Sequence, residues 1–257
     1  MIFTILILYF MPVIYAQNWE WKTFTSMQAI RSVAVTDTVM WAATEGGMVS
    51  YNLTTRSTRK WTNTEGLAAN DASAIAAESD SAVWIGFNNG AIQRYDIKTQ
   101  TFFTINEYLN REIRCLKVSG DSLLIGLDIG LSIYIISKRE VKETYKRLGI
   151  AFQVELAVQD IAILDNHIWI AAEQGIAIGQ LGTVNLLDPA NWQNITETDG
   201  LLNKNVVALH VWNNTIFAGT ESGLMQFIND NWVTHLSDRI LDIDDDGSFL
   251  FALTSVS

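Results

Sequence analysis

Short segments in which apolar and polar residues alternate recur along the whole chain. Val33 and Val35 form one such pair of apolar positions, and Ile161 and Ile163 form another. A period of two is typical of β-strands with one buried face. Gly, Asn and Asp separate the segments, as tight hairpins require. One unit divides in this way into the strands DASAIAAES, SAVWIGF, GAIQRYD and TQTFFTI.

A larger pattern recurs five times, in which a bulky apolar residue, here called the anchor, is followed six positions later by glycine. The pairs are Trp41 and Gly47, Trp84 and Gly90, Leu124 and Gly130, Trp169 and Gly175, and Phe217 and Gly223. The anchors are 43, 40, 45 and 48 residues apart, which is typical of β-propellers. We therefore predict an all-β chain, a β-propeller of four-stranded antiparallel blades, with about six blade units of which the last is incomplete.

Both members of the pair have a structural explanation. A single four-stranded sheet cannot cover both of its faces, so the anchor is expected to fill the space between neighbouring blades. The glycine is expected to allow a positive φ in the hairpin between the second and third strands of each blade.

The two ends of the chain carry topological information. NWEWKTF, which begins at Asn18, resembles the segment NWVTHL at 231–236, so we expect an outermost strand that closes the ring by completing the last blade. Residues 237–257 supply only an inner and a second strand, and Ser257 occupies the position of the repeat glycine. We therefore expect the propeller domain, residues 17–257, to be truncated at its C-terminal end and to be unstable with an open ring.

The first sixteen residues, MIFTILILYFMPVIYA, carry no charge. This run predicts a secretory signal peptide over residues 1–16, with cleavage before Gln17. No Lys or Arg precedes the run, which leaves a short membrane anchor as the alternative. No later segment is apolar and long enough to span a bilayer, so no transmembrane span is expected after cleavage.

Charge and cysteine content narrow the classes of function. The formal net charge is −11 and no cluster of Lys and Arg occurs, so nucleic acid is not expected as a partner. Cys115 is the single cysteine, so the chain cannot form an intramolecular disulfide.

The position four residues after each anchor is polar in every repeat. These residues, here called the rim, are Glu45, Asn88, Asp128, Glu173 and Glu221. Propeller geometry places the second hairpin and the connection to the next blade on one face, so the rim is a candidate binding site for sugar hydroxyls or a cation. Turn chemistry also explains polar residues at hairpin corners, and we favour that explanation. The loops at Gly66-Leu67 and Gly200-Leu201 share this face.

The segment DIDDDGS at 242–248 resembles the start of an EF-hand loop through Asp242, Asp244 and Asp246. The position that should hold a bidentate Glu is Leu253, and the segment coincides with a hairpin turn of the repeat. We therefore favour a solvated turn over a calcium site.

No sequence signature of catalysis is present. His167, His210 and His235 show no metal-ligand spacing, and the chain contains no nucleophile elbow, P-loop or zinc signature. Carboxylates are plentiful, but no pair stands out as a glycosidase pair. We expect no enzymatic activity, no cofactor and no bound metal.

The repeats resemble the two-component-regulator propeller repeat. The segments ASAIAAESDSAVWIGFNNGAIQRYD and TDGLLNKNVVALHVWNNTIFAGTESGLMQF carry its pattern, and Gly66-Leu67 and Gly200-Leu201 match its Gly-Leu start. The order of the segments, with REVKETYKRLG at 139–149 and NLLDPANW at 185–192, resembles the N-terminal propeller of PorZ-like accessory proteins of the type IX secretion system.

This resemblance implies an exported protein in the periplasm or at the outer membrane or cell surface of a Gram-negative bacterium. In that family two propellers precede a C-terminal β-sandwich, and the family delivers an anionic lipopolysaccharide to a cell-surface sortase. We expect this chain to lack the second propeller and the sandwich, which puts any function that needs them in doubt. We expect a non-enzymatic binding and scaffold propeller, with glycan or lipopolysaccharide and a sortase as partners. The alternatives are a glycan-sensing propeller of a hybrid two-component regulator and a polysaccharide-active enzyme.

Overall fold

The computed structural model describes residues 23–182 and 184–255 of the chain. Within these ranges the chain forms 22 β-strands in five four-stranded antiparallel sheets and one two-stranded sheet. The prediction of an all-β propeller with about six units and an incomplete last unit is therefore confirmed. The predicted signal peptide at 1–16 and the position of Ser257 lie outside the described residues.

Each sheet is one blade, and its strands follow the chain order. Blade 1 contains β1 (Ile30–Val35), β2 (Val39–Thr44), β3 (Gly47–Asn52) and β4 (Thr58–Trp61). Blade 2 contains β5 (Ala72–Ser79), β6 (Ala82–Phe87), β7 (Ile92–Asp96) and β8 (Thr101–Ile105). Blade 3 contains β9 (Ile113–Ser119), β10 (Ser122–Leu127), β11 (Gly130–Ile135) and β12 (Glu140–Tyr145).

The second half of the chain continues the same order. Blade 4 contains β13 (Val158–Leu164), β14 (His167–Ala172), β15 (Gly175–Gln180) and β16 (Trp192–Ile195). Blade 5 contains β17 (Val206–Trp212), β18 (Thr215–Thr220), β19 (Gly223–Ile228) and β20 (Asn231–Leu236). Blade 6 contains β21 (Ile240–Asp245) and β22 (Leu250–Thr254). Three short 3-10 helices lie in the connections: η1 (Asn63–Glu65), η2 (Pro189–Asn191) and η3 (Glu197–Asp199).

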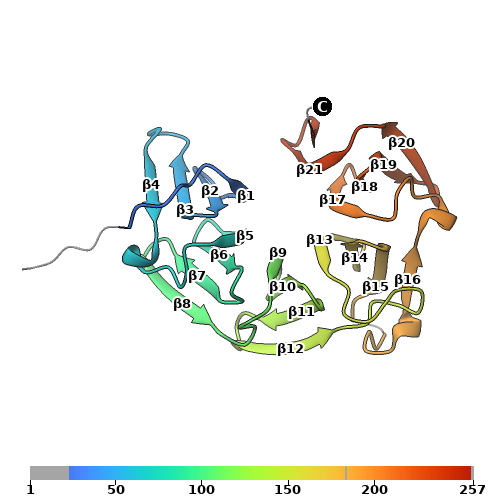
Figure 1. The fold of residues 1–257 in the computed structure, drawn as a ribbon, viewed down its shortest axis with the longest axis horizontal. Helices are drawn as coiled ribbons and strands as arrows, with labels where there is room; N and C mark the ends of the chain where they lie inside the picture. Colours follow the sequence, from blue (N-terminus) through green and yellow to red (C-terminus); the bar gives the residue numbers. More distant parts are fainter. Residues whose placement is uncertain (1–22, 183, 256–257) are drawn as a thin grey trace, which may run out of the picture.

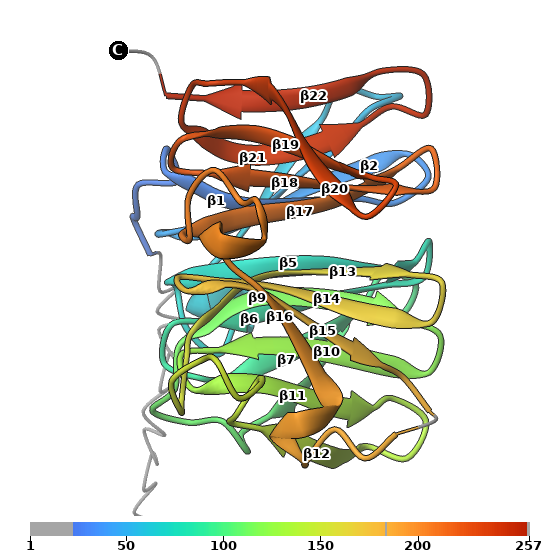
Figure 2. The same ribbon diagram turned by 90° about the vertical axis from the view of Figure 1, so that its right-hand side faces the viewer.

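The blades are arranged in an arc around a common centre (Figure 1). The first strand of every blade faces the centre, and in blades 1 to 5 the fourth strand lies at the periphery (Figure 1). Figure 2 shows β22 at one end of the stack of strands, beyond β21 and blade 5. The arrangement brings the six inner strands β1, β5, β9, β13, β17 and β21 together around one central channel.

The five anchors lie in the seams between neighbouring blades. Trp41, Trp84, Leu124, Trp169 and Phe217 are each at most 7% exposed. Each belongs to an apolar cluster that includes strands of the following blade, as Trp41 does with Ile85 and Trp84 with Ile125. Burial of bulky side chains between sheets is the main favourable contribution to such a stack.

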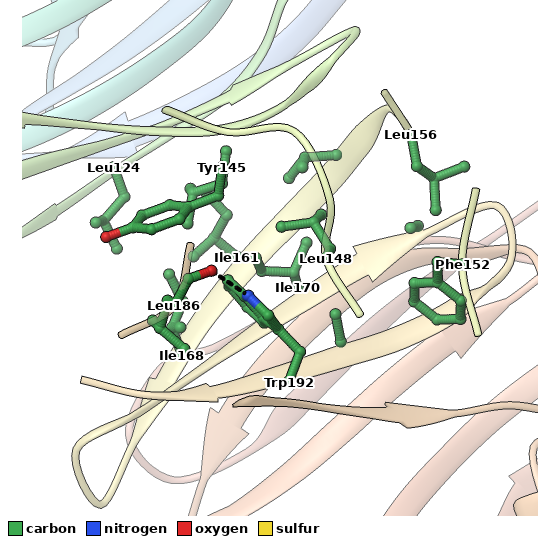
Figure 3. Packing of buried hydrophobic residues seen from close by; sticks show 14 of the residues in the cluster. Leu124, Tyr145, Leu148, Phe152, Leu156, Ile161, Ile168, Ile170, Leu186 and Trp192 are labelled. Carbon is green, nitrogen blue, oxygen red and sulfur yellow. Dashed lines mark hydrogen bonds between the residues drawn. The ribbon is translucent and has the colours of Figure 1, made fainter. Parts of the chain in front are cut away.

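The seam between blades 3 and 4 shows how a blade connection adds to this packing (Figure 3). Leu148 and Phe152, from the connection between β12 and β13, pack on the sheet of blade 4. Tyr145 meets Trp192 with a ring-centroid distance of 5.9 Å and an edge-on geometry. The Trp192 indole N–H donates to the Leu186 carbonyl oxygen at 2.7 Å, so its polar group is satisfied inside the core.

The repeat glycines all have positive φ, between +88° and +156°. Close approach of the outer strand is a second reason for glycine at these positions, beside the positive φ. A Cβ atom at Gly90 would overlap the carbonyl oxygen of Tyr108, which follows the outermost strand of the same blade. The other four repeat glycines approach the carbonyl oxygen at the end of the outer strand in the same way. The glycine therefore lets the hairpin and the outer strand come into contact.

The Gly-Leu motif ends a short helix on the connection between two blades. Thr62 caps η1 in a capping box with Glu65, and Gly66 ends it in the left-handed region at φ +107°. Leu67 then turns inward and is only 4% exposed. Gly200 and Leu201 repeat this arrangement after η3. The motif therefore anchors the loop that leads from an outer strand to the next inner strand.

The predicted N-terminal outer strand is not present in its described part. Asn18 to Lys22 lie outside the described residues, and Thr23 and Phe24 belong to no strand. Residues 23–29 instead follow the hairpin of blade 1: the Thr25 hydroxyl donates to the Gly46 carbonyl oxygen at 2.5 Å, and the Glu45 N–H donates to the Ala29 carbonyl oxygen at 3.3 Å. These bonds satisfy polar groups of the segment locally.

The two end blades expose apolar faces within the described residues. Phe251 of β22 occupies the anchor position of blade 6 and is 53% exposed. Ile30, the first residue of β1, is 59% exposed, whereas its equivalents Ile113 and Ile240 are fully buried. Both side chains therefore occupy seam positions that no described blade covers.

Candidate functional site

The rim residues lie on one face of the propeller, each in the hairpin between the second and third strands of its blade. The backbone N–H of Asn88 donates to the Asp71 carbonyl oxygen at 3.2 Å, next to the start of β5. Equivalent bonds link Glu45 to Ala29, Asp128 to Glu112 and Glu221 to Asn205, each at 3.3 Å. In blade 4 a side-chain hydrogen bond links the rim residue to the inner strand: the Gln159 amide donates to Glu173 Oε1 at 3.3 Å.

Neighbouring side chains pair with most of the rim. The Asn88 amide donates to Asp71 Oδ2 at 2.6 Å, and Asp71 pairs with Arg31 of the preceding blade at 2.5 Å. Arg239, just before β21, pairs with Glu221 of blade 5 at 2.8 Å. The rim is therefore a set of polar links within and between blades, not a ring of free carboxylates.

A cavity of about 640 Å³ occupies the centre, where the inner strands meet. Its charged lining divides into two sides: Arg31, Arg114 and Lys117 on β1 and β9, and Asp160, Asp242 and Asp244 on β13 and β21. Sequence reasoning missed this cavity as a site. The signal that could have found it is the third position of the inner strands, where Asp160 and Asp242 stand in place of the Ser, Ala or Cys of the other blades.

Asp160 links two blades through its carboxylate. One oxygen accepts from the Leu209 N–H of β17 at 2.8 Å, and the other accepts from the Ile161 N–H at 2.8 Å. Ser32 makes the equivalent link, because its hydroxyl oxygen accepts from the Ile75 N–H of the next blade at 3.2 Å. Burial raises the pKa of Asp160 to about 6, although the two backbone donors act in the opposite direction.

This pKa gives a prediction for the pH dependence of stability. The folded-state pKa of Asp160 lies above its ordinary value of 3.8, so folding favours the protonated form. The raised pKa therefore adds to the free energy of unfolding. This added stability is fully present below pH 3.8 and is lost as the pH rises through 6, at about 1.4 kcal/mol per unit of pKa difference. We expect the free energy of unfolding of the wild type to fall by about 2 kcal/mol from this source between pH 4 and pH 7. Asp160→Asn should not show this decrease.

Urea unfolding of both proteins at several pH values measures this difference. Asp238→Asn, at an exposed position with no such burial, serves as the control and should leave the pH profile unchanged. Parallel pH profiles for the wild type and Asp160→Asn would contradict the prediction.

A second pocket, of about 290 Å³, lies farther from the centre between blades 2 and 3. Arg94 lines it and forms two bonds to Glu78, at 2.6 and 2.8 Å. The hydrogen bond from Arg94 holds the pKa of Glu78 below its ordinary value. Glu78 also accepts from the Trp84 indole N–H at 2.7 Å, so this network secures a seam anchor.

The acidic segment at 242–248 forms the hairpin between β21 and β22. Asp246 Oδ1 accepts from the backbone N–H groups of Ser248 and Phe249, at 2.9 and 2.8 Å, which is the turn role expected for it. Asp242 lies on β21 and lines the central cavity. Within the described part of the chain, the three EF-hand-like aspartates are therefore not brought together. His167 is half-buried at the start of β14, and the exposed His235 on β20 packs its ring on Phe217, so neither belongs to this hairpin.

Comparison with known families and structures gives the following matches. The sequence model of the type IX secretion system PorZ N-terminal β-propeller domain matches residues 22–193. A comparison with curated protein sequences gave no match. Across the residues that the structure describes, there is no helix with the length and apolar character needed to cross a bilayer.

Solved structures share the fold at low sequence identity. The extracellular domain of the hybrid two-component system protein BT4673 from B. thetaiotaomicron superposes with a TM-score of 0.71 at 18% identity, covering 88% of this chain and 31% of its own. PorZ, a surface component of the type IX secretion system of Porphyromonas gingivalis, superposes with a TM-score of 0.71 at 16% identity, covering 91% of this chain and 36% of its own. The chain therefore spans about a third of these proteins.

Proposed function

The chain belongs to the family of PorZ N-terminal β-propeller domains, and we propose that it serves as a non-enzymatic binding and scaffold module of an exported type IX secretion accessory protein. The observation that carries this proposal is the family match over residues 22–193. The similarity to a surface component and to an extracellular domain supports a location in the periplasm or at the cell surface.

We further propose that the ligand is an anionic glycolipid of the lipopolysaccharide class, which the full-length protein passes to a cell-surface sortase. The whole chain is acidic, with a net charge of −11, so an anionic ligand needs a local positive site. Arg114 and Lys117 on β9 provide such a site at the central cavity, and Arg31 on β1, which pairs with Asp71, lines the same cavity. Charge-assisted hydrogen bonds from these side chains suit phosphate or carboxylate groups on a sugar.

The double substitution Arg114→Ala and Lys117→Ala tests this site. We expect the Kd for vesicles that contain anionic lipopolysaccharide to rise at least about tenfold, because each charge-assisted bond contributes about 1.5–3 kcal/mol. Vesicles of neutral phospholipid serve as the comparison surface. Lys98→Ala, in an exposed turn outside the cavity, is the matched control and should bind as the wild type does. Unchanged binding by the double variant would remove the cavity from the proposal.

A second candidate function is the extracellular sensor of a hybrid two-component regulator that binds glycans. It is favoured by the match to the BT4673 domain, whose TM-score of 0.71 equals that of PorZ. The reading frame of the complete gene separates the two functions. A second propeller followed by a β-sandwich supports the secretion accessory protein, whereas a membrane helix followed by a kinase supports the sensor.

A further inference from the structure

Three potential metal ligands meet at the seam between blades 5 and 6. His210 lies on β17, and Asp244 and Asp245 lie on β21. One nitrogen of His210 and one carboxylate oxygen of each aspartate all lie within 4.8 Å of one another. His210 Nε2 and Asp245 Oδ2 are 2.7 Å apart. We propose that this cluster binds a divalent transition-metal ion of the Zn²⁺ type.

The donor set suits such an ion. Imidazole nitrogen together with carboxylate oxygen favours Zn²⁺ and its neighbours over Ca²⁺ or Mg²⁺, which prefer oxygen ligands alone. A tetrahedral Zn²⁺ with bonds of about 2.0–2.1 Å holds its donor atoms about 3.4 Å apart. The three donors lie within 4.8 Å of one another, so each pair would need to change its separation by less than about 1.5 Å to reach that spacing. Three protein ligands leave a fourth position for water.

The local charge favours a cation. β21 and its hairpin carry Asp242, Asp244, Asp245 and Asp246 in close succession. Among the described residues, His210 is the one basic side chain within 4.0 Å of any of these four carboxylates. Asp244 and Asp245 hold carboxylate oxygens within 4.8 Å of each other, and Asp242 and Asp244 both line the central cavity, so these like charges repel one another. A bound dication would remove this repulsion.

The cluster is open to ions and water. The His210 and Asp245 side chains are 18% and 25% exposed, and Asp244 is exposed. His210 and Asp244 also line the central cavity, so water molecules in the cavity can complete the coordination shell. The site therefore needs no opening of the fold to be loaded.

Binding would connect the two-stranded blade to the rest of the propeller. The apolar cluster at this seam includes Phe217, Ile240 and Ile243 but extends over fewer buried residues than the other seams. A metal held by β17 and β21 would add a link at the channel side of this seam. Because the site is formed by two strands of different blades, the ion should bind the folded chain better than the unfolded one, and so stabilise it.

Calorimetric titration of the tag-free chain with ZnCl₂, after removal of metals with a chelator, tests the proposal. We expect one Zn²⁺ per chain in the wild type and loss of that binding in His210→Gln and in Asp244→Asn. His235→Gln is the matched control, because His235 on the outer strand β20 bonds to Gln226 on the neighbouring strand β19 and lies outside the cluster. This variant should bind Zn²⁺ as the wild type does.

Urea unfolding provides a second measurement and shows whether each variant folds. Zn²⁺ at a hundred times its Kd should raise the ratio of folded to unfolded wild-type chain about a hundredfold and leave that of folded His210→Gln unchanged. Absence of Zn²⁺ binding by the wild type would overturn the proposal, as would equal binding by folded His210→Gln.

Discussion

Trp84→Ala is expected to lower the free energy of unfolding by about 3–5 kcal/mol, the usual range for removal of a buried aromatic side chain. Trp84 is 1% exposed and lies in the seam between blades 2 and 3, with the Tyr134 ring 6.1 Å away in an edge-on geometry. Its loss leaves a cavity and removes the indole donor from Glu78. Urea unfolding followed by far-UV circular dichroism measures the change.

Phe251→Ala is the matched control, because Phe251 occupies the same repeat position in β22. Its side chain is already 53% exposed, so its truncation should cost less than about 1 kcal/mol. Trp84→Phe should fall between the two, because it keeps a ring in the seam and loses the hydrogen bond. Losses of similar size for Trp84→Ala and Phe251→Ala would show that the seams do not determine stability.

Gly90→Ala is expected to lower the free energy of unfolding by more than about 3 kcal/mol, which few single substitutions do. Two costs add at this position. The backbone φ is +88°, outside the range that L-residues favour. The new methyl group would also overlap the carbonyl oxygens of Tyr108 and Arg111, which are backbone atoms and cannot rotate away. Chemical denaturation at neutral pH measures the loss.

Gly120→Ala separates these two costs. Gly120 also has a positive φ, +55°, but a Cβ atom there would meet nothing within 4 Å. The substitution should therefore cost only the conformational penalty of about 1–2 kcal/mol. If both variants lose the same stability, close approach to the outer strand is not the reason for glycine at the repeat position.

The repeat made the blade architecture predictable because each strand role occurs several times in the sequence. The rim face followed from the same logic, since the rim residues stand at one distance from each anchor. The side-chain partners of the rim were not predictable. Arg31 pairs with Asp71, 40 residues away on another blade, and only the closed seam brings such residues together.

The inner strands show a second limit to what the sequence pattern predicts. Each of them carries a register shift near its third residue, for example between Val158 and Asp160 in β13. A bulge of this kind changes the phase of the period-two pattern, so alternation alone assigns the wrong face to the residues beyond it. In β13 the shift directs Asp160 to the next blade, where it meets Leu209. For this reason the alternation of the sequence did not place Asp160 and Asp242 at the central cavity.

The seams have a consequence for cooperativity. Each of the five apolar clusters joins one blade to the next, and within the described residues the blades at the two ends take part in one seam each. Such a molecule behaves as a linear array of coupled units, in which the free energy is a sum over nearest neighbours. Either end can then open while the interior seams stay intact, and the middle blades form the unit that opens last.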